Sequence, residues 1–229
     1  MKFQQFSQLI AISTVSAAAC LLSVGTAQAA TIVLDFEGVG DFAPVGNFYN
    51  GGAGTNYGID FSTTALGLVD SDNGGSGDFA NEPSPNTIMF FDTGAAATMN
   101  VAAGFDTGFS FFYTTIGNPG SVTVYDGLNG TGNILATLVL SATPSTGNGD
   151  PNGAFDVFAS TGVTFSGIAK SVDFGGVANQ IGFDDITLGS AIAGGGGQEV
   201  PEPFTIVGTL IGGTAAFRMK KNLKSSNKA

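Results

Sequence analysis

Short apolar runs separated by turn-forming residues make up the chain between Thr31 and Leu188. The runs are rich in Phe, Val, Ile and Thr, and the stretches between them consist mainly of Gly, Asn, Asp and Ser. No stretch before the carboxyl-terminal tail has the 3.6-residue apolar period of a helix. The pattern therefore predicts an all-β domain built from many short strands.

The first of these runs shows the alternation most clearly. Ile32, Leu34 and Phe36 alternate with Val33, Asp35 and Glu37, which predicts a strand with one buried face. Asp126–Gly130 is a predicted hairpin loop, because Gly and Asn accept positive φ at little cost. The predicted strands are 31–37, 58–61, 66–69, 87–91, 98–101, 108–114, 121–125, 134–140, 155–159, 163–165, 169–174 and 180–188.

About ten to twelve short strands at this spacing favour two packed antiparallel sheets in a jelly-roll-like sandwich. A partly closed barrel and an immunoglobulin-like sandwich are the alternatives. No internal repeat of 20 to 50 residues is evident, which argues against a solenoid.

The amino-terminal segment has the three parts of a secretory signal peptide. Lys2 opens a short polar start, an apolar stretch runs over 9–24, and Ala27-Gln28-Ala29 supplies a small-x-small cleavage site. The only cysteine, Cys20, lies in this segment; a lipoprotein would need a larger aliphatic residue three positions earlier. After cleavage near residue 29 the protein has no thiol, which excludes both disulfides and thiol catalysis.

The predicted sandwich is strongly acidic. Between Thr31 and Gly197, Lys170 is the one basic residue against sixteen carboxylates, which gives a formal charge of −15. Such a surface repels nucleic acid and anionic lipid and favours divalent cations or cationic partners. Keeping an exported domain soluble is an equally good explanation of the charge.

The carboxyl-terminal tail combines a stiff motif, an apolar run and basic residues. Val200-Pro201-Glu202-Pro203 is held extended by its two prolines. The fourteen uncharged residues 204–217 would span about 21 Å as a helix, which is shorter than the ~30 Å hydrocarbon core. The basic residues Arg218, Lys220 and Lys221 follow, and under the positive-inside rule they stay on the cytoplasmic side. A short transmembrane helix of this kind suits a transient membrane anchor.

This tail resembles the PEP-CTERM sorting signal of bacterial exported proteins. Val200, Pro201, Glu202 and Pro203 match its motif, and Arg218, Lys220 and Lys221 match its basic end. The tail departs from the family pattern in Phe204, where a small hydroxyl residue is usual, and in the dispersed basic residues. The resemblance implies that an exosortase-type membrane protease cuts the tail after secretion, so that the protein ends at the cell surface or outside the cell.

These segments define five parts of the chain. They are a signal peptide with an N-terminal helix (1–29), the β-sandwich domain (30–190), a flexible glycine-rich linker (191–199), the sorting signal with its short apolar helix (200–223) and a basic tail (224–229).

The first and last predicted strands of the domain carry a second resemblance. Residues 31–38 and 181–188 resemble the opening and closing strands of carbohydrate-binding-module-like jelly rolls, which lie side by side and commonly hold a structural calcium. The resemblance implies that Glu37, Asp184 and Asp185 contribute ligands, with Asp35 as a weaker candidate. Asp184 and Asp185 interrupt the alternation between Phe183 and Ile186 as a β-bulge would. An acidic edge that discourages aggregation is the alternative explanation.

A second acidic stretch, Asp70–Asp78, has carboxylates spaced for a loop round a cation. It is not an EF-hand, because Gly74 takes the fifth position and no glutamate takes the twelfth. An ordinary flexible loop is the preferred interpretation.

The composition also limits catalysis. The chain has no histidine and no tryptophan, so catalytic triads, the usual zinc sites and tryptophan sugar platforms are all excluded. Paired carboxylates alone could hydrolyse a glycoside, but the cationic groups that orient such substrates are nearly absent. We therefore expect no enzymatic activity.

Two functions remain. The first is a noncatalytic cell-surface or extracellular-matrix protein, exported by the secretion machinery and sorted through its tail. The alternative is an extracellular glycan-binding module that recognises a polysaccharide. The candidate stacking residues for a sugar are Tyr49, Tyr57, Tyr113 and Tyr125, although tyrosines in strands more often serve packing.

Overall fold

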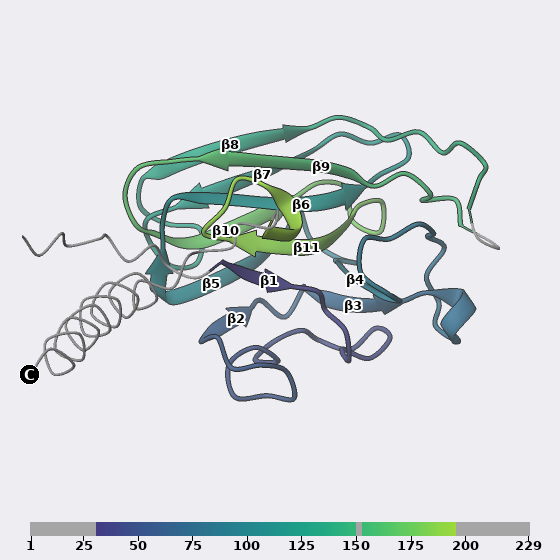
Figure 1. Ribbon diagram of the computed structural model, residues 1–229, viewed down its shortest axis with the longest axis horizontal. Coiled ribbons are helices and arrows are strands. Elements are labelled where there is room, and N and C mark those ends of the chain that lie inside the picture. Colours follow the sequence, from purple (N-terminus) through teal and green to yellow (C-terminus); the bar gives the residue numbers. More distant parts are fainter. Residues whose placement is uncertain (1–30, 150–152, 196–229) are drawn as a thin grey trace, which may run out of the picture. The chain divides into compact units, whose positions relative to one another are not determined.

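The computed structural model describes residues 31–149 and 153–195, which contain eleven strands and two short 3₁₀ turns (Figure 1). The strands are β1 (Ile32–Leu34), β2 (Ile59–Phe61), β3 (Leu66–Val69), β4 (Thr87–Phe90), β5 (Ala96–Phe105), β6 (Gly108–Thr114), β7 (Gly120–Tyr125), β8 (Ile134–Leu140), β9 (Ala159–Thr164), β10 (Ala169–Gly175) and β11 (Gly182–Leu188). The turns are η1 (Ser71–Asn73) and η2 (Ala193–Gly195). The predicted signal peptide, sorting signal and basic tail lie outside the described residues. Within the described ranges, no helix has the length and apolar character needed to cross a membrane.

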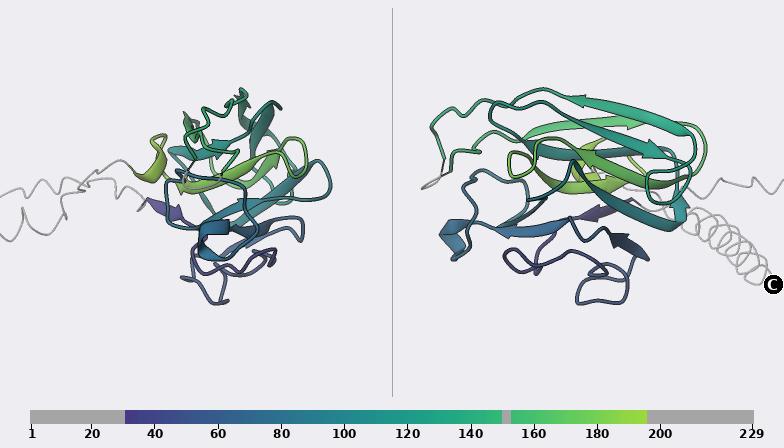
Figure 2. Two further views of the ribbon diagram at one scale, coloured as in Figure 1. Left: turned by 90° about the vertical axis from the view of Figure 1, so that its right-hand side faces the viewer. Right: turned by 180° about the vertical axis from the view of Figure 1, so that it is seen from behind.

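The strands pair into two antiparallel sheets. One sheet has the order β3-β4-β11-β6-β9, with β1 also paired to β11, and the other has the order β2-β5-β10-β7-β8. Successive strands from β4 to β7 and from β8 to β11 alternate between the sheets, as in a jelly roll. Figure 2 shows this arrangement from the side and from behind. The predicted all-β, antiparallel two-sheet sandwich is confirmed.

The two ends of the domain meet at β11. β1 pairs antiparallel with β11, from Ile32 opposite Leu188 to Leu34 opposite Ile186, so the predicted neighbourhood of first and last strands is confirmed. β4 pairs with the start of β11, at Gly182 and Phe183. Between these two partners the register of β11 against β6 shifts, which confirms the predicted bulge at Asp184 and Asp185.

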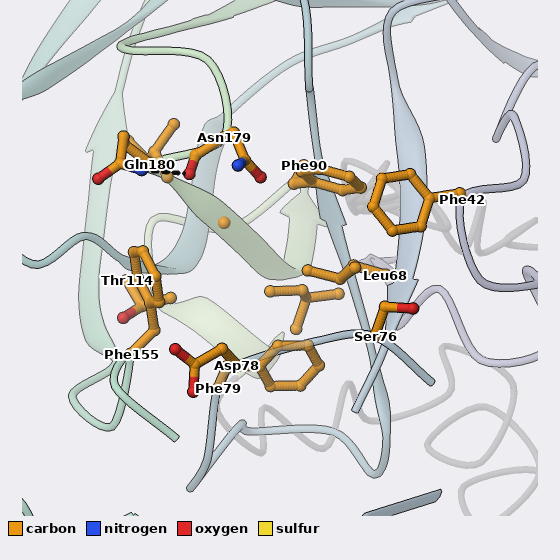
Figure 3. Close-up of a pocket in the computed structure, with 13 residues that line it drawn as sticks. Phe42, Leu68, Ser76, Asp78, Phe79, Phe90, Thr114, Phe155, Asn179 and Gln180 are labelled. Carbon is orange, nitrogen blue, oxygen red and sulfur yellow. Dashed lines mark hydrogen bonds between the residues drawn. The ribbon is translucent and has the colours of Figure 1, made fainter. Parts of the chain in front are cut away.

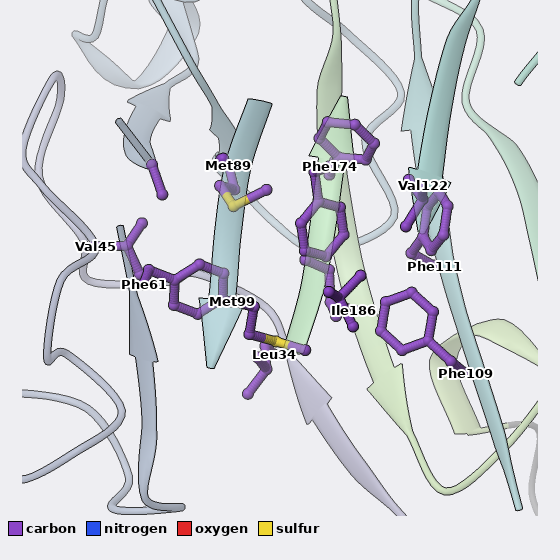
Figure 4. Packing of buried hydrophobic residues seen from close by; sticks show 14 of the residues in the cluster. Leu34, Val45, Phe61, Met89, Met99, Phe109, Phe111, Val122, Phe174 and Ile186 are labelled. Atoms are coloured by element: carbon purple, nitrogen blue, oxygen red, sulfur yellow. The ribbon is translucent and has the colours of Figure 1, made fainter. Parts of the chain in front are cut away.

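Aromatic rings from both sheets form the core (Figure 4). Phe111 of β6 and Phe183 of β11 pack edge-to-face against Phe174 of β10, with ring centroids 6.0 and 5.0 Å apart. All three side chains are fully buried. Edge-to-face contacts add about 0.5–1.5 kcal/mol each to the free energy gained from burial, so this cluster joins the two sheets without disulfides.

The predicted hairpin loop is also confirmed. β7 and β8 pair antiparallel on either side of it, and Asn129 and Gly130 have φ of 56° and 66°. Only residues that tolerate the left-handed region fit there at low cost.

One predicted strand was wrong. Phe155–Ala159 is not a strand: Phe155 makes only an isolated bridge to Phe79, and β9 begins at Ala159 and takes in most of the predicted strand 163–165. Asp156 is instead tied to the preceding loop, because its carboxylate accepts hydrogen bonds from Thr146 and Asn148. Burial opposes ionisation of Asp156, but these hydrogen bonds outweigh it and lower its pKa.

The start of the predicted linker is folded rather than free. Gly194 N donates to Thr187 Oγ1 at 3.0 Å, and Ser190 O accepts a hydrogen bond from Ser110 Oγ at 2.9 Å. These contacts hold η2 against β11 and β6, and the rest of the predicted linker, 196–199, lies outside the described residues.

Candidate functional site

The bulge in β11 places two adjacent carboxylates in the gap between β4 and β1. The loop after β1 and the loop before β4 meet there, and we call the region formed by Asp35, Glu37, Ser84, Asp184 and Asp185 the acidic junction. Asp185 has a φ of 47°, in the left-handed region that residues other than Gly, Asn and Asp rarely adopt.

Asp184 is fully buried, and both of its carboxylate oxygens accept hydrogen bonds. Ser84 N donates to Oδ2 at 3.0 Å, Ser84 Oγ lies 2.8 Å from Oδ1, and Asp185 N donates to Oδ1 at 2.7 Å. Burial raises the pKa of Asp184 to about 8, although the hydrogen bonds from Ser84 oppose the rise. The side chain therefore ties the loop before β4 to the closing strand.

The other acids of the junction are less enclosed. Thr87 N donates to Glu37 Oε1 at 2.8 Å. Burial raises the pKa of Glu37; the hydrogen bond from Thr87 opposes this rise, and the negative charge of Asp35 adds to it. Burial, and then the charge of Asp35, also raises the pKa of Asp185. The structure thus brings Glu37, Asp184 and Asp185 into one electrostatic neighbourhood around Asp35.

This neighbourhood does not have the geometry of a formed metal centre. Among the described residues, no three or more Asp, Glu, His or Cys side chains are arranged to hold a metal ion. Calcium takes six to eight oxygen ligands, whereas protein donors already engage both oxygens of Asp184 and Oε1 of Glu37. The structural calcium at Glu37, Asp184 and Asp185 stays a prediction.

The second acidic stretch forms a turn. Asn73 N and Gly75 N both donate to the carbonyl oxygen of Asp70, at 3.1 and 2.9 Å, around η1. Burial raises the pKa of Asp70, and the charge of Asp72 adds to the rise. Nothing in the described geometry gathers these carboxylates round a cation.

The four candidate tyrosines have different environments. Tyr49 and Tyr113 are buried, so the prediction of these two as stacking residues was wrong. Tyr49 is a packing group whose Oη accepts a hydrogen bond from Phe36 N at 2.8 Å, and burial raises its pKa. Tyr125 is half-buried, whereas Tyr57 is 38% exposed. Tyr57 is therefore the most exposed of the four.

Tyr57 belongs to a polar pocket of about 360 Å³, which we call the tyrosine pocket. It is formed by β1 and the long connection from β1 to β2. Its lining residues are Val33, Asp35, Glu37, Gly38, Phe48, Tyr49, Ala53, Gly54, Thr55 and Tyr57.

A more apolar pocket of about 380 Å³ opens beside β3, β4 and the start of β11 (Figure 3). We call it the phenylalanine pocket. Its lining residues are Phe42, Leu68, Ser76, Asp78, Phe79, Ile88, Phe90, Thr114, Phe155, Asn179, Gln180, Ile181 and Gly182. Phe42 and Phe90 lie on one side and Thr114 and Phe155 on the other, with Asn179 and Gln180 along a third side.

Phe42 is the unusual residue of this pocket. Its side chain is 49% exposed, and its ring packs edge-to-face on Phe90 with centroids 5.3 Å apart. Its φ is 51°, which is strained for a bulky residue. Hydrogen bonds from Phe42 N to Gly67 O and from Ala43 N to Gly40 O fix this conformation. Backbone strain of this kind costs about 1–3 kcal/mol and often accompanies functional sites.

The polar groups of the pocket differ in how far they are satisfied. Ser76 Oγ donates to Asp41 Oδ2, and Asp78 Oδ1 accepts from Ala154 N. Thr114 is buried, and its Oγ1 has no hydrogen-bond partner in the described part of the chain. A buried hydroxyl without a partner is costly, so Thr114 is an unsatisfied polar group in the wall of the pocket.

The sequence did not reveal this pocket. Its walls come from segments around residues 42, 76–79, 155 and 179–182, which show no common motif. The predicted sorting residues Val200, Pro201, Glu202, Pro203, Arg218, Lys220 and Lys221 lie outside the described residues.

No protein-family model matches the chain, and no curated protein sequence matches it. The similar solved structures include a family 6 carbohydrate-binding module, which is 16% identical with a TM-score of 0.37 and matches 69% of this chain and 92% of its own. A carbohydrate-binding module from Cellvibrio mixtus lichenase 5A is 12% identical, with a TM-score of 0.34 over 55% and 86% of the two chains. A cleaved adhesin domain of Lys-gingipain from Porphyromonas gingivalis is 13% identical, with a TM-score of 0.39 over 69% and 97%. At these TM-scores the similarities do not identify what this chain binds.

Proposed function

We propose that the chain is a noncatalytic, exported surface protein whose sandwich binds an extracellular glycan in the phenylalanine pocket. The observation that carries this proposal is the pairing of a half-exposed, strained Phe42 with the buried, unpartnered hydroxyl of Thr114 across one pocket.

This combination suits a sugar ring. A pyranose has faces made of C–H groups and a rim of hydroxyls, each of which can both donate and accept a hydrogen bond. Phe42 and Phe90 supply apolar surface for a face, and the amides of Asn179 and Gln180 supply donors and acceptors at the rim. Ligand pockets of about 300–1,000 Å³ commonly combine an apolar lining with a few placed polar groups.

The same pocket lacks the parts of a glycosidase. Glycoside hydrolysis by the common mechanisms needs two carboxyl groups, about 5–5.5 or 6.5–9.5 Å apart, on either side of the scissile bond. Among the described residues that line the pocket, Asp78 is the only acid, and its Oδ1 accepts a hydrogen bond from Ala154 N. This lining supports binding rather than turnover as the proposed role.

The exported, surface-sorted part of the proposal is supported by the sequence alone. The signal peptide predicts secretion, and the tail from Val200 to Lys221 predicts an exosortase-type protease as processing partner, with a transient membrane anchor before cleavage. A domain cut free of its anchor in this way would meet polysaccharide outside the cell.

A polysaccharide array tests the binding. We expect specific retention of the purified wild-type protein on one class of glycan, and loss of that retention in Phe42→Ala. Ile168→Ala is the matched control, because Ile168 is also 49% exposed but does not line the pocket. Retention that survives Phe42→Ala, or the absence of any retention by folded wild-type protein, would overturn the glycan proposal. The second of these results would favour a purely structural role in the extracellular matrix.

A further inference from the structure

The tyrosine pocket brings two acids and two aromatic rings to one cavity. All four belong to the connection from β1 to β2, with Asp35 and Glu37 at its start and Tyr49 and Tyr57 in its second half. The rings of Tyr49 and Tyr57 are stacked, with centroids 6.2 Å apart and planes 28° apart. The phenylalanine pocket shares no lining residue with this one, so the two sites can be tested separately.

The charge in this pocket is unbalanced. Lys170 is the one basic residue in the described ranges, and it does not line the pocket. Asp35 is exposed, and the described contacts of its carboxylate fall on Oδ1, from Glu37 N at 3.3 Å and Tyr49 Oη at 3.5 Å. Both contacts are long, so the carboxylate keeps most of its capacity to accept hydrogen bonds. A positively charged ligand would relieve the repulsion between Asp35 and Glu37.

The aromatic walls decide which kind of cation fits. A hard divalent ion needs an oxygen shell, and ring faces cannot provide it. An organic ammonium group instead gains from both features, since carboxylates pair with its charge and the π faces of tyrosine attract it. The volume of about 360 Å³ also has room for the carbon skeleton attached to the nitrogen.

We infer that the tyrosine pocket binds an organic ammonium group, with Asp35 as its main ionic partner and Tyr57 as its aromatic wall. The group can belong to a lysine side chain of a partner protein or to an amino sugar of a polymer. The nitrogen would lie beside Asp35, with the attached carbons against the ring of Tyr57. This inference does not rest on glycan binding in the phenylalanine pocket.

Titration of the purified protein by two-dimensional NMR tests the inference, with pairs of probes in which acetylation of the nitrogen removes its charge. Nα-acetyl-lysine methylamide is compared with its Nε-acetylated form, and glucosamine is compared with N-acetylglucosamine. We expect shifts of the amides around Asp35 and Tyr57 with the charged member of at least one pair, and binding at least about tenfold weaker with its neutral counterpart. The pair that responds identifies the source of the ammonium group.

Three variants localise the effect. Asp35→Asn keeps an oxygen that can accept from Glu37 N, and it should weaken binding about tenfold. Tyr57→Leu keeps apolar bulk but removes the π face, and it should weaken binding about three- to fivefold. Asp92→Asn, at an exposed acid outside the pocket, controls for the general effect of net charge and should leave binding unchanged.

Several results would overturn the inference. Equal binding of charged and neutral probes, or equal weakening by Asp35→Asn and Asp92→Asn, would show that no specific ammonium site exists. Absence of binding by either charged probe at millimolar concentration would do the same. If the wild-type protein binds neither ammonium probe but binds Ca²⁺ tightly, and Asp35→Asn removes the Ca²⁺ binding, the pocket is a metal site. Thermal melting of each variant confirms that it is folded.

Discussion

Replacement of Thr114 by valine tests the central feature of the phenylalanine pocket. Valine has almost the same shape as threonine but lacks the hydroxyl, and Thr114 Oγ1 is buried without a partner in the described structure. Removing an unsatisfied buried hydroxyl recovers part of its desolvation cost, which is about 1–3 kcal/mol. We therefore expect Thr114→Val to raise the free energy of unfolding by about 1 kcal/mol. For a domain of this size the midpoint of thermal unfolding should rise by about 2–4 °C.

Thr143→Val provides the matched control, because the same substitution there removes a hydroxyl that is fully used. Thr143 Oγ1 accepts a hydrogen bond from Thr115 N at 2.7 Å and donates to Thr115 O at 2.6 Å. Its loss leaves the buried Thr115 N unpaired, whereas Thr115 O keeps the hydrogen bond from Thr143 N, so the free energy of unfolding should fall by about 1–3 kcal/mol. The two variants therefore have expected effects of opposite sign.

Urea denaturation followed by tyrosine fluorescence and circular dichroism measures both effects, provided that the slope against denaturant stays unchanged. If Thr114→Val destabilises the protein as much as Thr143→Val does, the Thr114 hydroxyl has a partner in solution and the reasoning about an unsatisfied hydroxyl in the pocket wall is refuted. If it stabilises the fold and also weakens retention on the polysaccharide array, the hydroxyl serves binding at the expense of stability.

Three further predictions concern the junction and the tail. The pKa of Asp184, raised from 3.8 to about 8, means that its contribution to stability is full below about pH 4 and falls as the pH rises toward 8. In metal-free buffer, this residue should make the free energy of unfolding fall by about 1.4 kcal/mol per pH unit between pH 5 and 7, and Asp184→Asn should remove that fall. If urea titrations give the same pH dependence for the variant and the wild type, the raised pKa of Asp184 is contradicted. A chelator should lower the melting midpoint if Glu37, Asp184 and Asp185 bind calcium, and an unchanged midpoint removes that hypothesis. Glu202→Ala should leave uncut precursor in the cell envelope, whereas normal processing on immunoblots would count against the sorting signal.

Alternation and turn chemistry made most strands of this domain predictable. β6, β7, β8 and β11 lie within about two residues of their predicted limits, because each run begins at or next to Gly, Asn or Asp. The bulge at Asp184 was also visible, since two consecutive acids interrupted a buried face. The prediction of a strand at 155–159 was wrong because its composition suits a strand, but Phe155 makes only an isolated bridge to Phe79.

The pockets were not predictable in the same way. They depend on which loops meet after the sheets have packed, and a single sequence contains no local signal of that meeting. The tyrosines illustrate the difficulty: Tyr49 and Tyr57 stand eight residues apart in similar polar surroundings, yet one is buried and the other is 38% exposed. Phe42 likewise has an ordinary loop context, and only its φ of 51° and its position against Phe90 single it out.

The closing strand connects these features physically. Gly182 of β11 lines the phenylalanine pocket, while two residues further on Asp184 holds Ser84, whose Oγ also lies 3.1 Å from the carbonyl oxygen of Asp35 at the tyrosine pocket. Both pockets therefore depend on the acidic junction for the position of at least one wall. A substitution that removes the hydrogen bonds between Asp184 and Ser84 should weaken ligand binding in both pockets. Substitutions at Phe42 or Tyr57 should each weaken binding in one pocket only.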